Sequence, residues 1–208
     1  MQVINKYFTQ LTAAQAQQFE TLLRLYPEWN AKVNVISRRD IDNLEVNHIL
    51  HSLAIARFVQ FAPGTHVLDL GTGGGFPAIP LAVMFPATHF HLVDRIGKKL
   101  RVAQDVSTQA GLDNVTVQHG DIREVKGAFD FVVSRAVMPL PDMVPLVRRL
   151  IAKPQRNAVP NGLICLKGGN LDDELRPYAK QVVIEDISTY FNEPFFATKR
   201  IIHLPIII

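Results

Sequence analysis

The stretch VLDLGTGGGFPAIPLAV, residues 67–83, carries the strongest structural signal in this chain. It joins a short apolar run to a helix-like run through four glycines, Gly71 and Gly73 to Gly75. Glycines allow a ligand to approach the main chain closely, and the start of a helix favours an anion or a nucleotide. The pattern predicts a nucleotide-type ligand at the end of a buried strand.

The chain has 208 residues, 48% of them hydrophobic, which suits one compact unit with one sizeable core. Apolar residues recur at helical spacing through residues 9–35 and again through 40–59, where Asp40 is a candidate N-cap. Pro63 and Gly64 then break the pattern. We expect residues 1–62 to form a helical segment and residues 63–208 to form the ligand-binding domain.

Five short apolar or β-branched runs follow this break, separated by helix-length segments: residues 66–70, 89–94, 115–120, 129–134 and 162–168. The alternation predicts an α/β fold with a mostly parallel sheet and helices on both faces. Two further runs, 181–191 and 198–208, have no helix between them, and we expect an antiparallel hairpin at the sheet edge. The sheet would then have seven strands.

Charge and hydropathy narrow the class of protein. No basic-then-apolar signal opens the chain and no apolar run approaches the roughly 20 residues that span a bilayer, so we expect a cytoplasmic protein without membrane contact. The net charge is +3 and the pI is near 9.1, and cationic clusters suit a polyanionic partner, although each also fits a solvated helix face. The single cysteine, Cys165, is interpreted as a buried structural residue.

The positions of the glycines in the turn distinguish a dinucleotide ligand from S-adenosylmethionine. A dinucleotide-binding turn reads G-x-G-x-x-G, and Phe76 stands where its third glycine belongs. The segment instead resembles the D-x-G-x-G-x-G motif of class I S-adenosylmethionine (SAM) dependent methyltransferases, which have a Rossmann-like fold. The matching residues are Asp69, Gly71, Gly73 and Gly75.

Two acidic positions support a SAM site. Asp94 ends the second expected strand, where a carboxylate can accept hydrogen bonds from both ribose hydroxyls. Asp121, followed by Ile122 and Arg123, comes after the third strand, beside the expected adenine. Loop solvation is the alternative for both acids. Phe76 is expected at the mouth of the pocket against the cofactor, with a plain core position as the alternative.

The segment SRAVMP, residues 134–139, is expected to face the transferred methyl group. Enzymes that methylate exocyclic amines commonly carry Asn or Asp, then Pro-Pro and an aromatic residue there, and cytosine-C5 enzymes need a cysteine nucleophile. Neither pattern fits. A lone-pair nucleophile such as guanine N7 needs alignment but no dedicated base. Arg135 is the candidate catalytic, orienting residue, and a salt bridge at the sheet edge is its alternative.

Nearly the whole chain resembles the GidB/RsmG family, which methylates guanine N7 in a conserved decoding-region loop of small-subunit (16S) rRNA. The resemblance is carried by YPEWNAKVNVISRRDIDNLEVNHILHSLAIARF, DLGTGGGFPAIPLA, LVDRIGKKLRV, SRAV, LKGG and FFATKRIIHLP. It implies SAM as cofactor and small-subunit rRNA or the ribosomal particle as partner.

By position, the resemblance places cofactor contacts at Gly71, Phe76, Ile122, Arg123 and Arg135. RNA-facing candidates are Arg38, Lys167 and the HILHS residues His48, His51 and Ser52, with ordinary structural histidines as the alternative. We expect a monomer without a metal site. Two other function classes stay open: a non-catalytic RNA-binding protein that keeps the SAM fold, and an NAD-dependent oxidoreductase, against which Phe76 counts.

Overall fold

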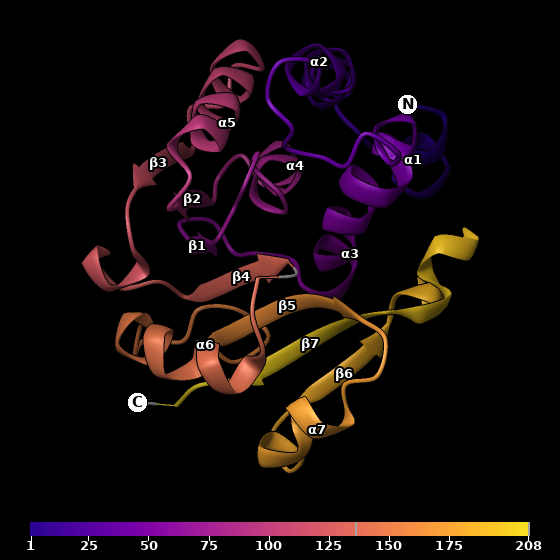
Figure 1. Cartoon of the computed structure of the whole chain (residues 1–208). Helices are drawn as coiled ribbons and strands as arrows, with labels where there is room; N and C mark the ends of the chain where they lie inside the picture. The colour runs from indigo at the N-terminus through magenta and orange to yellow at the C-terminus, as the bar shows by residue number, and fades with distance from the viewer. Residues whose placement is uncertain (136, 208) are drawn as a thin grey trace.

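The computed structural model describes residues 1–135 and 137–207, and Ala136 and Ile208 lie outside the described residues. The described strands form one sheet in the order β3-β2-β1-β4-β5-β7-β6 (Figure 1). Strands β1 to β5 are parallel, and β7 runs antiparallel to β5 and β6, so the seven-stranded sheet with its C-terminal hairpin is confirmed. The strands are β1 (His66–Leu70), β2 (His89–Asp94), β3 (Val115–His119), β4 (Phe131–Arg135), β5 (Gly162–Gly168), β6 (Val183–Asp186) and β7 (Lys199–Pro205).

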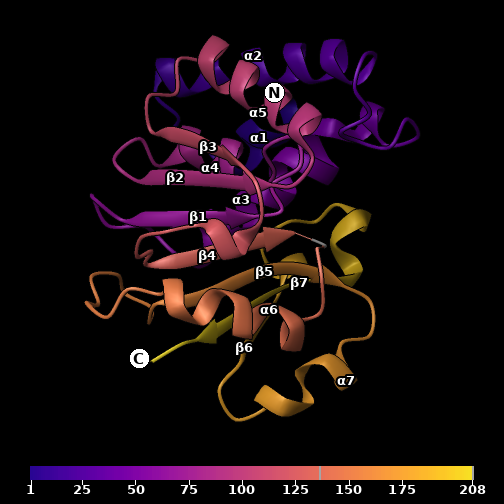
Figure 2. The same cartoon turned by 60° about the vertical axis from the view of Figure 1, so that its left-hand side comes forward.

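Helices cover the two faces of the sheet unequally. Figure 2 shows α6 in front of β5 and β7, while the same face of β1, β2 and β3 is open. The opening arises because β3 is joined to β4 through a single 3-10 turn, η3 (Ile122–Glu124). The helices are α1 (Gln2–Tyr7), α2 (Ala13–Asn30), α3 (His51–Phe58), α4 (Ala78–Met84), α5 (Gly97–Gln109), α6 (Leu140–Val147) and α7 (Asp172–Leu175).

The central strands contribute side chains to a hydrophobic core on each face of the sheet, because successive side chains along a strand point to opposite faces. In β1, Val67 joins the core beneath α2 to α5, whereas Leu68 and Leu70 join the core beneath α6. Cys165 of β5 is 1% exposed, and burial raises the pKa of its thiol to about 12. The interpretation of Cys165 as a buried structural residue is confirmed.

Residues 40–59 differ from the prediction. The segment begins with a 3-10 turn, η1 (Ile41–Asn43), and a π-helical turn, η2 (Leu44–Leu50), before α3. Asp40 stands at the N-cap position of η1, as predicted, but its carboxylate makes no capping hydrogen bond. It accepts hydrogen bonds from the side chains of Asn47 and His48, each at 2.5 Å, because the wide π turn brings these residues back over Asp40.

The hairpin connection also differs from the prediction. The expected strand-like run 181–191 is a strand only at β6, and the 3-10 turns η6 (Ile187–Thr189) and η7 (Pro194–Thr198) lie between β6 and β7. Helix α1 was not expected from the spacing of apolar residues. In residues 1–135 and 137–207, no helix combines the length and apolar character that crossing a membrane requires. The division of the chain after residue 62 stays a prediction.

Helix α2 begins with a capping box that the substitution Thr12→Ala tests. The Thr12 hydroxyl accepts the Gln15 N–H at 3.2 Å, and the Gln15 side chain accepts the Thr12 N–H at 3.0 Å. We expect the variant to lose about 1 kcal/mol of unfolding free energy in urea denaturation. Thr21→Ala is the control, because the Thr21 hydroxyl donates only to a carbonyl of its own helix. An equal loss in both variants would contradict the capping role.

Candidate active site

The turn after β1 is the first part of the site. Gly71, Gly73 and Gly75 have φ angles of +67°, +58° and +106°, which L side chains rarely adopt. A Cβ at Gly75 would lie 2.3 Å from Cδ1 of Ile79, whereas a Cβ at Gly73 would meet nothing within 4 Å. Gly73 therefore borders open space, where a ligand can reach the backbone.

The side chain of Asp69 stabilises this turn through two hydrogen bonds. Its side chain is fully buried, and Oδ2 accepts hydrogen bonds from the Thr72 hydroxyl at 2.7 Å and from the Ala78 N–H at 3.1 Å. Burial raises the pKa of Asp69 to about 7, although both hydrogen bonds and the charge of Arg135 oppose the change. Asp69, expected near the cofactor, thus shapes the turn from the protein side.

A cavity of about 460 Å³ lies at the carboxyl ends of β1, β2 and β3. Three of the predicted cofactor contacts, Gly71, Asp94 and Ile122, line it. Asp94 Oδ2 accepts the Gly73 N–H at 2.8 Å, which ties β2 to the turn. The other lining residues are Leu70, Val93, Arg95, Ile96, Lys99, Gly120, Val137, Met138 and Leu146. A carboxylate, open glycine backbone and apolar walls fit the ribose and base of a nucleoside.

Asp121 and Arg123 stand on either side of Ile122 in the chain but are not among the residues that line this cavity. The Arg123 guanidinium donates to Asp121 at 2.9 Å and 3.0 Å, and Arg95 pairs with the same carboxylate. These hydrogen bonds, those of Arg123 first, lower the pKa of Asp121. The Arg123 N–H also binds Asp121 at the start of η3, so the pair fixes the turn that carries Ile122 into the cavity.

Arg135 and Phe76 form a stack beside the turn. The guanidinium carbon of Arg135 lies 4.8 Å from the centre of the Phe76 ring, and the Tyr26 ring packs on Phe76 at 4.6 Å. Phe76 is 3% exposed and is part of the core rather than of the cavity lining. The Tyr26 hydroxyl donates to the Gly74 carbonyl at 2.8 Å. Burial lowers the pKa of Arg135 to about 10, so Arg135 is charged at neutral pH.

A second cavity, of about 410 Å³, is lined in part by the carboxyl ends of β4 and β5. Four predicted residues line it, namely His48, His51, Arg135 and Lys167, together with Asp40, Asn47, Leu166, Gly168, Leu171, Glu174, Phe195 and Lys199. Val137 and Met138 line the first cavity, and the Met138 carbonyl accepts a hydrogen bond from Lys167 of the second. Adjoining cavities at the carboxyl edge suit a reaction between two substrates.

His48 and His51 are neutral at neutral pH. Burial, and then the charge of Arg135, lowers the pKa of His48 to about 4, against the effect of Asp40. The same two causes lower the pKa of His51 well below its usual value. Among residues 1–135 and 137–207, neither His48 Nδ1 nor His51 Nε2 has a hydrogen-bond partner, although both atoms are buried.

Of the remaining RNA-facing candidates, Lys167 lines the second cavity, whereas Ser52 and Arg38 do not. Lys167 Nζ pairs with Glu174 at 2.6 Å and donates to the Met138 carbonyl at 2.9 Å. Ser52 is fully buried, and its hydroxyl donates to the His48 carbonyl within the helical segment. Arg38 is exposed before η1 and lines neither cavity. The structure therefore brings His48, His51, Arg135 and Lys167 together and leaves the other two outside.

Sequence reasoning missed three residues that shape the site. Tyr26 holds the glycine turn, and Glu174 accepts the Leu140 N–H at 2.6 Å, at the start of α6. Val137 lies against Gly71, where a Cβ would be 2.6 Å from its Cγ2. No local motif marks these residues, because each acts on a segment distant in the sequence.

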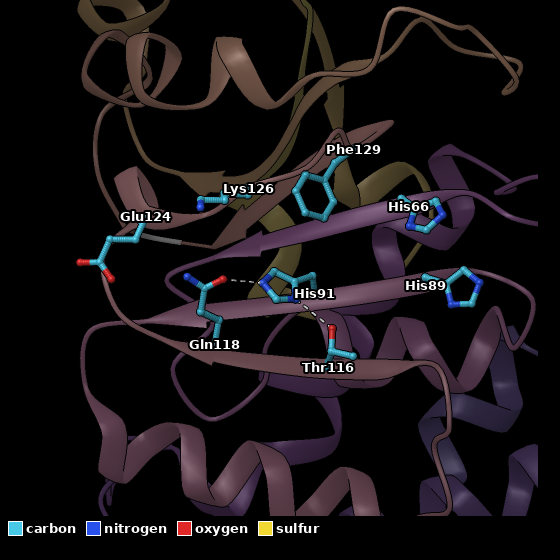
Figure 3. A pocket seen from close by; sticks show the side chains of 8 residues that line it. All are labelled: His66, His89, His91, Thr116, Gln118, Glu124, Lys126 and Phe129. Atoms are coloured by element: carbon cyan, nitrogen blue, oxygen red, sulfur yellow. Dashed lines mark hydrogen bonds between the residues drawn. The ribbon is translucent and has the colours of Figure 1, made fainter.

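A third hollow, of about 430 Å³, lies on the helix-free face of β1, β2 and β3 (Figure 3). The His91 ring is hydrogen-bonded to Thr116 at 2.8 Å and to Gln118 at 3.0 Å. None of the predicted site residues lines it; the lining is His66, His89, His91, Thr116, Gln118, Glu124, Lys126 and Phe129. Within the described part of the chain, no group of three or more His, Cys, Asp or Glu residues is arranged to hold a metal ion.

The sheet order and the glycine turn define a class I SAM-dependent methyltransferase. Two solved structures share this fold. A SAM-dependent methyltransferase from Aquifex aeolicus has a TM-score of 0.57 at 15% identity, over 79% of this chain and 93% of that chain. A SAM-dependent O-methyltransferase from Thermotoga maritima has a TM-score of 0.59 at 14% identity, over 81% of this chain and 71% of that chain.

The chain belongs to the GidB family, rRNA small subunit methyltransferase G, whose family model matches residues 15–202. A protein of Bacteroides thetaiotaomicron named ribosomal RNA small subunit methyltransferase G is 57% identical over 98% of both chains. A protein of the same name from Cytophaga hutchinsonii is 46% identical over 99% of both chains. The family, the fold and the SAM-dependent methyltransferase class expected from the sequence are confirmed.

Gly73→Ala tests the approach of the cofactor to the turn, with Gly111→Ala as a matched control. Both glycines have positive φ, +58° and +65°, and both face open space. Each variant is expected to lose about 1 kcal/mol of stability from backbone strain. Only Gly73→Ala should weaken SAM binding in calorimetry, by about tenfold or more, because its methyl group would enter the space beside the turn where we expect the cofactor. Equal SAM affinity in both variants would contradict this placement.

Asp69→Asn tests the buried carboxylate through pH. The pKa of Asp69 is higher in the folded than in the unfolded chain, so its stability contribution is present at low pH and is lost as the pH rises through about 7. Asparagine does not titrate. From about pH 5.5 to about pH 8, the variant should gain about 1 to 2 kcal/mol of unfolding free energy relative to wild type. A pH-independent difference between the two proteins would contradict the raised pKa.

Proposed function

We propose that this protein transfers a methyl group from SAM to N7 of a guanine in the conserved decoding-region loop of small-subunit (16S) rRNA. The family supports rRNA as the substrate. The observation that favours N7 concerns the two carboxylates that line the second cavity, because both are already engaged in hydrogen bonds or ion pairs. Asp40 is bound to Asn47 and His48, and Glu174 is bound to Lys167 and the Leu140 N–H. Among the described lining residues, neither carboxylate is free to act as a general base.

An acceptor that needs no base matches this site. Guanine N7 has an in-plane lone pair, loses no proton when it is methylated, and leaves the base positively charged. An exocyclic amine must also lose a proton, which requires a proton acceptor. His48, with a pKa of about 4, is a weak base at neutral pH. Alignment of the acceptor is then the main contribution of the protein.

The first cavity suits the cofactor. We propose that Asp94 accepts the ribose hydroxyls through its remaining lone pairs, that Ile122 contacts the adenine, and that Gly71 and Gly73 lie along the methionine portion. Asp121 and Arg123 keep η3 in place beside the base. When SAM is bound there, it supplies a methyl group on a positively charged sulfur.

Arg135 orients the acceptor in this proposal. Its guanidinium faces Phe76 and makes one long hydrogen bond within the described residues, from Nη1 to the Asn47 carbonyl at 3.5 Å. Its other N–H donors are directed at no described acceptor and suit a base carbonyl or a phosphate. We expect RNA to approach over the helical N-terminal residues, with salt-dependent affinity. The protein would act as a monomer in the bacterial cytoplasm, on naked rRNA or on the particle.

Nucleoside mass spectrometry tests the proposal. Small-subunit rRNA from cells lacking the gene is incubated with the purified protein and SAM, as free RNA and as assembled subunits. We expect one 7-methylguanosine to form at the site that is unmodified in those cells. Methylation of any other base atom, or no new mark on either substrate, would contradict the proposal.

Arg135→Lys tests the orienting role. Lysine keeps the charge but lacks the planar set of donors, so kcat/KM for rRNA should fall by about tenfold to a hundredfold while SAM affinity changes little. Arg200→Lys is the control, because Arg200 pairs with Asp186 away from both cavities. A parallel loss of SAM affinity in Arg135→Lys would instead assign Arg135 to the cofactor.

A further inference from the structure

Two residues that line the second cavity carry a buried ring nitrogen for which no described residue is a hydrogen-bond partner. His48 Nε2 lies 2.5 Å from Asp40 Oδ2, and a carboxylate only accepts, so Nε2 carries the proton and Nδ1 is bare. His51 Nε2 is likewise buried and has no hydrogen-bond partner among the described residues. We infer that the other ring nitrogen, Nδ1, carries the proton of His51, because the Asn47 backbone favours a proton on this ring. Unpaired buried acceptors are rare because they cost free energy, and they are therefore candidates for ligand contacts.

Both rings are held firmly. His48 packs against Phe76 at 5.5 Å, and His51 packs edge-on against Phe195 at 5.4 Å. His51 is 6% exposed, and its ring is nevertheless part of the cavity wall. Arg135, the third member of the group, offers only donors. Two bare acceptors and a guanidinium therefore belong to residues that line one cavity.

We propose that His48, His51 and Arg135 read the Watson–Crick edge of the acceptor guanine. The two bare nitrogens accept hydrogen bonds from N1–H and the 2-amino group, and the guanidinium donates to O6. This inference rests on the proposed function and adds the residues that select the base. It leaves N7 outside the hydrogen-bonded edge, with its lone pair free for the incoming methyl group.

The same arrangement rejects adenine at two positions. Adenine presents an amino donor where guanine has O6, facing the donors of Arg135, and an unprotonated N1 facing a bare imidazole nitrogen. Unpaired polar groups of this kind discriminate strongly between bases. The contacts also assist the reaction, because methylation makes the guanine ring positive and N1–H a stronger donor, so the bond to the imidazole strengthens as the charge develops.

The test combines protein variants with a changed base. Small subunits are reconstituted with guanine or inosine at the methylated position, inosine lacking only the 2-amino group. Wild type should prefer guanine by about tenfold in kcat/KM. His51→Phe or His48→Gln, whichever residue faces the amino group, should lose this preference while its SAM affinity stays within about twofold of wild type. If both folded variants keep the wild-type preference, the inference is wrong.

His203→Phe is the matched control. His203 is also a buried histidine, but its Nε2 lies 2.9 Å from the Pro160 carbonyl and its ring lines neither cavity. This variant should keep the preference for guanine even if it loses stability. If wild type makes no 7-methylguanosine on unmodified rRNA, the proposed function fails, which is a different result from a lost or retained inosine preference.

A second measurement needs no variant. Nitrogen NMR of the wild-type imidazoles, with guanosine or adenosine monophosphate added, should show His48 protonated at Nε2 and His51 at Nδ1. Guanosine monophosphate should shift the bare-nitrogen signals of both rings, and adenosine monophosphate should not. Equal shifts with both nucleotides, or the opposite ring tautomers, would overturn the inference.

Discussion

Beneath the glycine turn, the buried carboxylate of Asp69 accepts hydrogen bonds from Thr72 within the turn and from Ala78 at the start of α4. Gly73 can leave its backbone open to a ligand because the buried side chain of Asp69 fixes the path of the turn through these hydrogen bonds. Asp94 fixes the turn from the next strand through the Gly73 N–H. The first cavity, the position of α4 and the stack on Phe76 all depend on this path of the chain.

The stack of Tyr26, Phe76 and Arg135 connects the glycine turn to the second cavity. Tyr26 binds the Gly74 carbonyl and packs on Phe76, and Phe76 carries the guanidinium of Arg135 on its ring. Such a contact contributes about 1 to 2 kcal/mol when it is shielded from water. The helical N-terminal residues therefore contribute to both parts of the candidate site: they supply Tyr26 to the turn and both histidines to the second cavity.

The regular parts of the molecule were predictable from local patterns. Strands β1, β2 and β5 have the expected bounds because their apolar runs end at clear turn signals. Gly71, Asp94 and Ile122 reach one cavity because parallel strands bring their carboxyl ends together. One local rule misled beside the second cavity. Asp40 stands at the N-cap position of η1, but its carboxylate binds the side chains of Asn47 and His48 instead of capping the turn. These side-chain contacts cannot be read from the local sequence pattern.

A crystal structure with bound S-adenosylhomocysteine would test most directly whether the two cavities form one reaction centre. We expect the adenosine to fill the first cavity beside Asp94 and the sulfur to lie near Val137 and Met138, turned toward Arg135. A sulfur atom on the η3 side of the first cavity, turned away from Arg135, would contradict the assignment of the second cavity to the methyl acceptor.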